Sequence, residues 1–144
     1  MDRQMKIASV LIAVLLATST VHAEKLHEVK TSGMVIKDAL EVHAFDDPDI
    51  KGITCYYTLP KKPLSVEDQT DSSVSCRQVG PISGNLSTKS SIMEASKSWF
   101  VKELRLDRIY DKGRNVLVYL TYTKKLSGDN ANNSISIVPL YVAK

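Results

Sequence analysis

The alternation of apolar and polar side chains along the chain is typical of short β-strands. Leu40, Val42 and Ala44 fall on one parity, and Glu41 and His43 fall on the other. Successive side chains of a strand point to opposite faces, so this segment predicts a half-buried strand with its aliphatic residues inward. His43 is then expected on the polar, exposed face.

Further strands follow at close spacing, separated by residues that interrupt them. Asp46-Asp47-Pro48-Asp49 ends the first strand, because proline lacks an amide hydrogen and aspartate side chains cap turns. Gly80-Pro81 is expected to end another strand in the same way. A starting strand or arm is expected before Lys37. The other strands are predicted at residues 50–58, 74–79 and 134–141, with a short strand or turn at 92–95.

The clearest element is a β-hairpin between residues 100 and 123. Its arms alternate on either side of Asp111-Lys112-Gly113-Arg114, a turn in which Gly113 is free to adopt a positive φ. The second arm, residues 116–123, is apolar on both faces, which predicts a central strand. The basic residues near the hairpin ends, Arg108 among them, are expected to form a solvated rim.

Together these elements predict the fold class. Six or more short strands, with at most one helical turn at residues 66–71, are typical of an all-β domain. The pattern favours a small antiparallel β-sandwich or barrel and leaves both open. Pro139 removes a ladder donor, so the last strand is expected to lie at an edge.

The first 23 residues have the pattern of a cleaved signal peptide. Arg3 and Lys6 precede an apolar run at residues 7–17, and Val21-His22-Ala23 then offers a cleavage site before Glu24. The run is well short of the ~20 residues that a spanning helix needs. We therefore expect export, and a soluble domain of residues 24–144 with no membrane span after cleavage. The formal net charge of the chain is +3, which argues against a nucleic-acid partner.

Cys55 and Cys76 are the two cysteines of the chain, and we predict that they form a disulfide. An exported protein with a pair of cysteines is most simply bridged. Cys55 shares strand parity with Ile53, and Cys76 shares it with Val74, so both sulfurs are expected to face the core. The alternative is a redox-active pair, but catalytic thiols usually occupy a Cys-x-x-Cys turn, which this chain lacks.

The acidic turn is a candidate ligand or ion site. Asp46, Asp47 and Asp49 offer hard oxygen ligands of the kind that Ca²⁺ prefers, although the same residues are ordinary turn formers. We predict no resident cofactor, with Ca²⁺ as the alternative. No cluster of histidine and cysteine suits zinc, and no Gly-x-Ser-x-Gly elbow suggests a serine nucleophile. A catalytic role would have to rest on paired carboxylates, as in glycoside hydrolysis, and we assign no catalytic residues.

The hairpin is a candidate interaction surface. Tyr110, Tyr119, Tyr122 and Arg114 lie on its arms and turn, where aromatic rings and a guanidinium group are suited to binding a partner. Half-buried strands also favour aromatic residues for packing alone, so both interpretations stay open.

Four segments in order, AFDDPDIKGITCYY (44–57), SSVSCRQVGPI (72–82), RIYDKGRNVLVYLTYTKKL (108–126) and NSISIVPLY (133–141), resemble successive blocks of the bacterial CreA family. The resemblance implies a periplasmic protein of Gram-negative bacteria, from a family named after an operon that responds to the carbon source. It carries no catalytic residues over to this chain. We therefore expect a non-catalytic module that binds an envelope protein or a small ligand, with a carboxylate-based hydrolase or a Ca²⁺-binding domain as alternatives.

Overall fold

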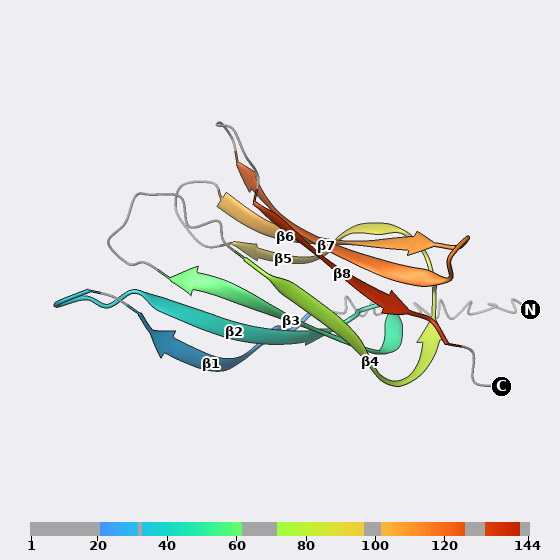
Figure 1. The fold of residues 1–144 in the computed structure, drawn as a ribbon, viewed down its shortest axis with the longest axis horizontal. Helices are drawn as coiled ribbons and strands as arrows, with labels where there is room; N and C mark the ends of the chain where they lie inside the picture. Colours follow the sequence, from blue (N-terminus) through green and yellow to red (C-terminus); the bar gives the residue numbers. More distant parts are fainter. Residues whose placement is uncertain (1–20, 32, 62–71, 97–101, 126–131, 142–144) are drawn as a thin grey trace, which may run out of the picture.

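Two antiparallel sheets form a sandwich in the computed structural model, which describes residues 21–31, 33–61, 72–96, 102–125 and 132–141 (Figure 1). The first sheet has the strand order β1-β2-β3-β4, and the second has β5-β6-β7-β8. The strands are β1 (Glu24–Lys30), β2 (Ala39–Asp46), β3 (Ile50–Lys61), β4 (Val74–Gly84), β5 (Lys89–Ser96), β6 (Lys102–Asp111), β7 (Val116–Lys125) and β8 (Asn133–Pro139). The all-β prediction is confirmed, and the choice between sandwich and barrel falls on the sandwich.

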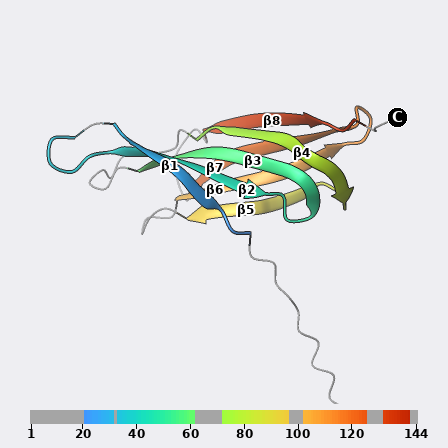
Figure 2. The ribbon, with the colours of Figure 1, turned by 90° about the horizontal axis from the view of Figure 1, so that it is seen from below.

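The core lies between the two sheets and is built from the inward parity of each central strand. Ile53, Cys55 and Tyr57 of β3 face Leu106 of β6 and Leu117 of β7 across this space, and all five are buried. Figure 1 shows the two layers edge-on, and Figure 2 looks from below through the first sheet onto the second. Aliphatic and aromatic burial of this kind stabilises the sandwich by roughly 25 cal/mol per Å² of apolar surface.

Strand β2 turns the opposite face to the core from the one predicted. Its aliphatic residues lie half-buried on the outer face: Leu40, Val42 and Ala44. The register with β3 places Phe45 opposite Cys55, so the aromatic ring joins the disulfide inside the sandwich. Glu41 shares that parity and is buried too. The pattern of one strand cannot show which of its two faces packs against the bulky side chains of its neighbours. In this fold, the register with β3 buries the face that carries Phe45.

Strand β4 passes through Gly80-Pro81, where the sequence predicted its end. The ladder between β3 and β4 shifts between Lys51 and Ile53, which marks a β-bulge. Gly52 has φ +83° there, and a Cβ atom on it would lie 2.4 Å from the carbonyl oxygen of Pro81. The bulge therefore lets the sheet accommodate a proline, as bulges and edge positions do.

The hairpin of β6 and β7 is confirmed, and β7 is central in its sheet as predicted. The ladder runs without a shift from Lys102 opposite Lys125 to Asp111 opposite Val116. The positive φ of the turn belongs to Asn115 (φ +55°) rather than to Gly113. Asparagine tolerates this region better than most residues, and here its side-chain amide donates a hydrogen bond to the carbonyl oxygen of Leu140 at 2.6 Å. The last strand, β8, ends at Pro139 and lies at the edge, as expected.

Strands β4 and β8 lie side by side where the two sheets meet (Figures 1 and 2). The amide of Cys76 donates a hydrogen bond to Ser136 Oγ at 2.8 Å, and the amide of Val74 donates one to Ser134 Oγ at 3.4 Å. Serine side chains thus satisfy the free edge of β4, in the place of a neighbouring strand. An edge covered in this way is protected from pairing with another chain.

Several predictions fall outside the described residues. These are most of the leader (residues 1–20), the helical turn at 66–71 and the turn at 127–130. The described residues contain no helix that is long and apolar enough to span a bilayer.

The predicted disulfide is confirmed. Cys55 of β3 and Cys76 of β4 are opposite one another in the ladder, and their sulfur atoms are bonded. Both side chains are buried in the core. The bond joins positions 21 residues apart, so it restricts the unfolded chain over a loop that includes residues 62–71.

Replacing both cysteines, Cys55→Ala with Cys76→Ala, should lower the free energy of unfolding by about 3 kcal/mol, the value for a loop of this length. Urea unfolding of the oxidised chain and of the double variant measures the difference. Mass determination after alkylation under denaturing conditions, with and without reduction, shows whether the bond has formed. Equal stability of the two proteins would contradict the prediction.

Candidate functional site

A row of polar side chains crosses the inner face of the second sheet. Lys89 of β5 is opposite Arg108 of β6, Arg108 is opposite Tyr119 of β7, and Tyr119 is opposite Ser136 of β8. Arg108 and Tyr119 are completely buried. An inner sheet face is normally apolar, so this row requires polar partners from the first sheet.

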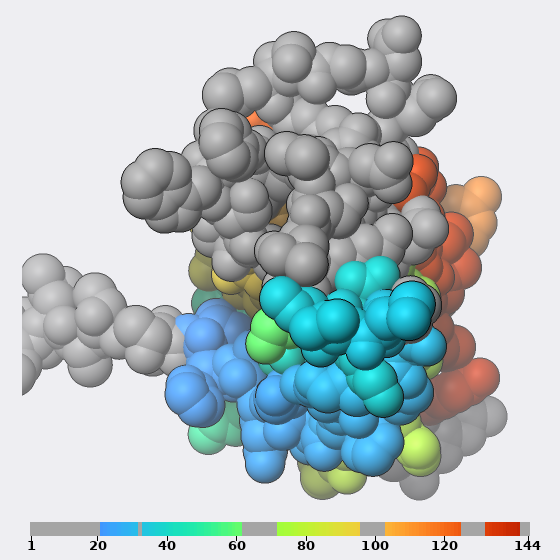
Figure 3. Space-filling model, turned by 90° about the vertical axis from the view of Figure 1, so that its left-hand side faces the viewer, coloured from blue at the N-terminus to red at the C-terminus, as the bar shows by residue number. Residues whose placement is uncertain are grey.

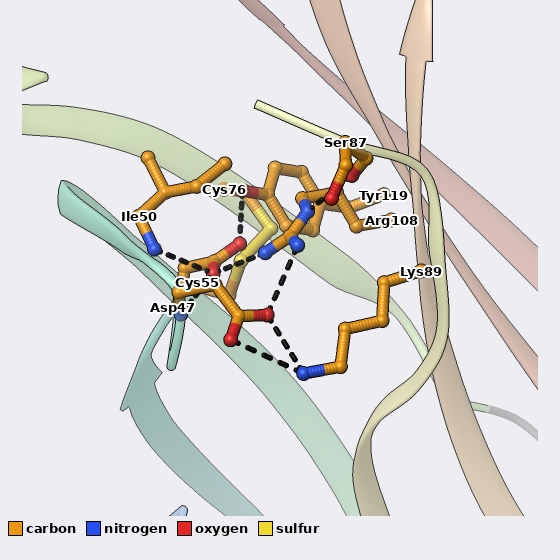
Figure 4. Close-up of polar contacts among 9 residues, drawn as sticks. Asp47, Ile50, Cys55, Cys76, Ser87, Lys89, Arg108 and Tyr119 are labelled. Carbon is orange, nitrogen blue, oxygen red and sulfur yellow. Dashed lines mark hydrogen bonds and ion pairs between the residues drawn. A yellow bond between two sulfur atoms is a disulfide. The ribbon is translucent and has the colours of Figure 1, made fainter. Parts of the chain in front are cut away.

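The acidic turn between β2 and β3 supplies those partners (Figure 4). Asp47 Oδ1 accepts hydrogen bonds from the backbone amides of Asp49 (2.9 Å) and Ile50 (3.0 Å), and from Arg108 Nη1. Asp47 Oδ2 accepts the hydroxyl of Tyr119 at 2.7 Å. The carboxylate thus folds its own turn and at the same time binds the opposite sheet.

All three nitrogen atoms of the Arg108 guanidinium group donate hydrogen bonds. Nε donates to the carbonyl oxygen of Ser87 at 2.9 Å, Nη1 donates to Asp47, and Nη2 donates to Asp49 Oδ2 at 3.0 Å. Lys89 Nζ completes the group by binding both oxygens of Asp49, at 3.1 and 2.9 Å. We call Asp47, Asp49, Arg108, Tyr119 and Lys89 the inter-sheet cluster.

The electrostatics of the cluster follow from these contacts. The hydrogen bond from Lys89, with that from Arg108, holds the pKa of Asp49 below its ordinary value. Burial, together with the hydrogen bond to Asp47, raises the pKa of Tyr119. Burial alone would lower the pKa of Arg108, but its bonds to Asp47 and Asp49 outweigh that effect and raise it. All of these shifts favour a fixed charge pattern, with charged Asp49 and Arg108 and neutral Tyr119.

The cluster is fully occupied by its own contacts. Among the described residues, every buried side-chain nitrogen or oxygen atom has a hydrogen-bond partner. A general base or nucleophile needs a lone pair that is free to reach a substrate. Asp47, whose oxygens already accept four hydrogen bonds, is placed to join the sheets rather than to carry out chemistry.

A comparison with known proteins gives the family. The family model described as CreA protein matches residues 26–143. The chain belongs to the CreA family. It is 36% identical over 133 residues to Protein CreA of Escherichia coli strain K12, a match that covers 83% of this chain and 85% of that relative. The Protein CreA sequences of E. coli O6:H1 strain CFT073 and of E. coli O157:H7 match to the same extent. No solved structure matches.

The three carboxylates predicted as a ligand or ion site diverge in this CreA-family fold. Asp47 points inward, and Asp49 is shared between Arg108 and Lys89. Asp46 lies on the other face of β2, where its Oδ1 accepts a hydrogen bond from Thr54 Oγ1 at 2.6 Å. The described residues contain no group of three or more histidine, cysteine, aspartate or glutamate side chains that could hold a metal ion. Sequence reasoning found the turn but not its partner, Arg108, which it placed in a solvated rim.

The four residues predicted as an interaction surface lie at different places in the fold. Tyr119 is completely buried in the inter-sheet cluster, and Tyr110 packs partly buried against the core. Tyr122 is half-buried on the outer face of β7, and its hydroxyl lies 3.4 Å from Asp107 Oδ1. Arg114 is exposed in the turn, paired with Asp111. Strand parity separates Tyr119 from Tyr122.

A second polar group lies on β2 and involves the histidine that the sequence placed on an exposed face. His43 is half-buried: its Nε2 is 2.9 Å from Glu41 Oε2, and its ring stacks on Tyr57. Lys61 and Lys25 also pair with Glu41, at 3.3 and 3.5 Å. The bond to His43, together with these lysines, holds the pKa of Glu41 below its ordinary value. These pairs explain why an acidic residue is tolerated at an inward position.

An open hollow of about 700 Å³ lies near the start of β4 and β8. Its described lining is aliphatic, hydroxyl and amide, with no charged side chain: Leu40, Thr58, Pro60, Ser72, Ser73, Asn132 and Asn133. The volume is within the range of small-ligand sites, roughly 300–1,000 Å³. The hydroxyls of Thr58 and Ser73 lie 3.1 Å apart and bond each other. The hollow is a weaker candidate than the surfaces discussed below.

Replacing Arg108 by methionine should destabilise the fold by roughly 3–5 kcal/mol, because Asp47 is then left as an unpaired buried charge. The double variant Asp47→Asn with Arg108→Met should lose less than the sum of the two single variants, since it removes both charges. Urea unfolding midpoints measure all three proteins. Lys89→Met is the control: that lysine is half exposed, and its loss should cost less than about 1 kcal/mol. Additive effects of the first two changes would contradict a direct coupling.

Stability should fall at acid pH in a way that depends on Asp49. Its pKa in the folded chain is below the ordinary value of 3.8, so its contribution is complete above that value and is lost as the pH falls through the folded pKa. The urea midpoint of the wild-type chain should therefore drop more steeply below about pH 4 than that of Asp49→Asn. Parallel pH profiles for the two proteins would show that Asp49 makes no such contribution.

Proposed function

We propose that this CreA-family protein is exported to the periplasm of a Gram-negative bacterium, is processed before Glu24, and acts there as a non-catalytic module that binds a protein partner. The binding surface is the outer face of β6, β7 and β8. The observation that carries the proposal is a continuous group of aliphatic side chains on that face: Ile109, Val118, Leu120, Ile135 and Ile137. We call this group the aliphatic face.

The ladder brings these five side chains into two adjacent rows. Ile109, Val118 and Ile137 are opposite one another across the three strands. Leu120 and Ile135 are opposite one another in the next row. Ile135 and Ile137 keep 59% and 54% of their surface exposed. The outer face of an antiparallel sheet is ordinarily polar, so a contiguous apolar group there indicates a contact surface.

The surroundings of the aliphatic face resemble the edge of a protein interface. Charged groups flank it along β6, where Arg105 binds Glu103 at 2.8 Å and Asp107 lies near the hydroxyl of Tyr122. At the other end, Arg114 pairs with Asp111 in the turn. An apolar centre with a polar, partly aromatic rim is the usual arrangement of protein interfaces. A flat sheet face also suits a protein surface better than it suits a small molecule.

Export is supported by the leader pattern and by the disulfide. Arg3, Lys6 and the apolar run at residues 7–17 have the charge and length of a secretory signal. The Cys55–Cys76 bond is of the kind that persists in oxidising compartments. The family match begins at residue 26, two residues beyond Glu24, the first residue of the proposed mature chain.

The alternatives with chemistry of their own receive less support. A carboxylate-based hydrolase or a Ca²⁺ site at the acidic turn would both require Asp47 and Asp49. Those carboxylates are bonded to Arg108 and Lys89 instead. A binding role requires only the exposed side chains of the aliphatic face.

A photo-reactive residue placed at Ile109 should cross-link a partner protein in intact cells that process the chain. The same residue placed at Val79 of β4, an aliphatic position in the other sheet that is more exposed than Ile109 (57% against 39%), should not. Adding Ile135→Thr and Ile137→Thr to the Ile109 probe should weaken the cross-link by about tenfold or more, because the apolar centre of an interface carries most of its binding energy.

Unchanged unfolding midpoints in the periplasmic fraction would show that the threonine variants are folded. Cross-links of equal strength from both probe positions, or a cross-link that survives both threonine substitutions, would overturn the assignment of the surface. Recovery of the chain with its leader in the cytoplasm would overturn the proposed location.

A further inference from the structure

The connection between β1 and β2 presents three consecutive apolar side chains to solvent. Met34 and Val35 are 101% and 93% exposed, and Ile36 is also exposed. Gly33 precedes them and Lys37 follows them. We call residues 33–37 the hairpin tip. Large aliphatic side chains at this level of exposure, next to one another, usually mark a contact site.

The backbone of the hairpin tip is held in a definite turn. The amide of Thr31 donates to the carbonyl of Asp38 at 2.8 Å and closes its base. Gly33 has φ +112°, and a Cβ atom on it would lie 2.2 Å from the carbonyl oxygen of Ile36. The chain therefore folds tightly back on itself, and the side chains of Met34 and Val35 are left on the outside of the turn.

The hairpin tip extends past the ends of the other labelled strands in two perpendicular views (Figures 1 and 2). Seen end-on, the corresponding part of the chain faces the viewer (Figure 3). The two sheets of the chain do not cover the apolar side chains of the hairpin tip. Such a projection is suited to inserting into a lipid bilayer rather than to binding a partner in a groove.

We propose that the hairpin tip inserts into the interfacial region of an anionic membrane surface. Lys30 and Lys37 stand on either side of the apolar residues, and Lys61 is opposite Ala39 at the same end of the sheet. Lysine stems lie along apolar surface while their ammonium groups reach lipid phosphates. The apolar tip and its lysines therefore match the two layers that a bilayer surface offers, acyl chains below and anionic headgroups above.

Two features favour lipid over a protein partner at this position. The residues between Gly33 and Lys37 carry no polar side chain, so the tip offers little for specific hydrogen bonding. The acidic groups near the tip share their lysines: Glu28 pairs with Lys30 and Lys25, and Glu41 pairs with Lys61 and Lys25. With Lys37 and the neighbouring Asp38, four lysines stand against three carboxylates, which leaves a small surplus of positive charge. The attachment is weak and reversible, comparable to the marginal binding of a single acyl chain.

This inference goes beyond the proposed protein partner and is independent of it, because the aliphatic face belongs to the other sheet. The test uses the chain processed at Glu24 with its disulfide formed, so that the leader contributes nothing. The probes are vesicles of equal parts phosphatidylethanolamine and phosphatidylglycerol, and vesicles of phosphatidylcholine alone. Sedimentation of the vesicles measures the bound fraction of the chain.

The wild-type chain should bind the anionic vesicles and bind the neutral ones less. Met34→Ser with Val35→Ser should lower the partition coefficient by about tenfold or more, because two inserted aliphatic side chains are lost. Lys30→Gln with Lys37→Gln should weaken binding to anionic vesicles and leave binding to neutral vesicles unchanged. Val79→Ser is the matched control, and it should bind as the wild type does.

Circular dichroism and the unfolding midpoint confirm that each variant is folded, which is expected because the substituted side chains are exposed. Absence of binding to either vesicle, or equal binding by the Met34 and Val35 double variant, would overturn the proposal. If that variant lost a protein cross-link in cells while no vesicle bound the wild type, the tip would be a protein contact and the lipid proposal would be wrong.

Discussion

The ion pair between Asp47 and Arg108 determines how the two sheets lie against each other. Hydrophobic contact between sheets is non-directional and permits several alignments. A buried charge permits few, because its desolvation costs several kcal/mol unless a partner is placed correctly. Asp47 has four hydrogen-bond donors around it, and Arg108 has three acceptors. A shifted sheet would leave at least one of the two charges without its partner.

The polar row on the inner face of the second sheet, which includes Arg108 and Tyr119, continues to β8 at one edge of that sheet. Ser136 follows Tyr119 in the row, and its hydroxyl accepts the amide of Cys76. Cys76 is in turn bonded to Cys55, beside the inter-sheet cluster (Figure 4). The polar row, the covered edge of β4 and the Cys55–Cys76 disulfide are therefore connected to one another and act together in holding the two sheets. Cross-sheet polar networks that are fully satisfied define a single alignment of a core.

Two groups of exposed apolar side chains lie at separate places on the described part of this CreA-family protein. The aliphatic face lies on the outer side of β6, β7 and β8, and the hairpin tip projects from the end of β1 and β2. Insertion of the tip into a membrane surface leaves the aliphatic face of the other sheet free for a protein. The fold is thus suited to presenting one surface to a partner while another holds the domain near lipid.

The sequence by itself determined the all-β class, the β6–β7 hairpin, the edge position of the last strand and the pairing of Cys55 with Cys76. Each of these depends on local chemistry: side-chain alternation, turn residues, a missing amide hydrogen, and a chain with two cysteines. These features can be predicted from the sequence because each is set by residues that are close to one another along the chain.

The tertiary structure decided which face of β2 is buried, which carboxylates pair with Arg108, and which tyrosine of the hairpin is completely buried. Asp47 and Arg108 are separated by 61 positions, and no local pattern connects them. Their meeting joins a turn of the first sheet to a strand of the second, a contact that no single stretch of the sequence contains. In sequence, Arg108 looks like an ordinary surface residue of a charged hairpin arm, with Asp107 beside it. Its actual carboxylate partners, Asp47 and Asp49, come from the other sheet.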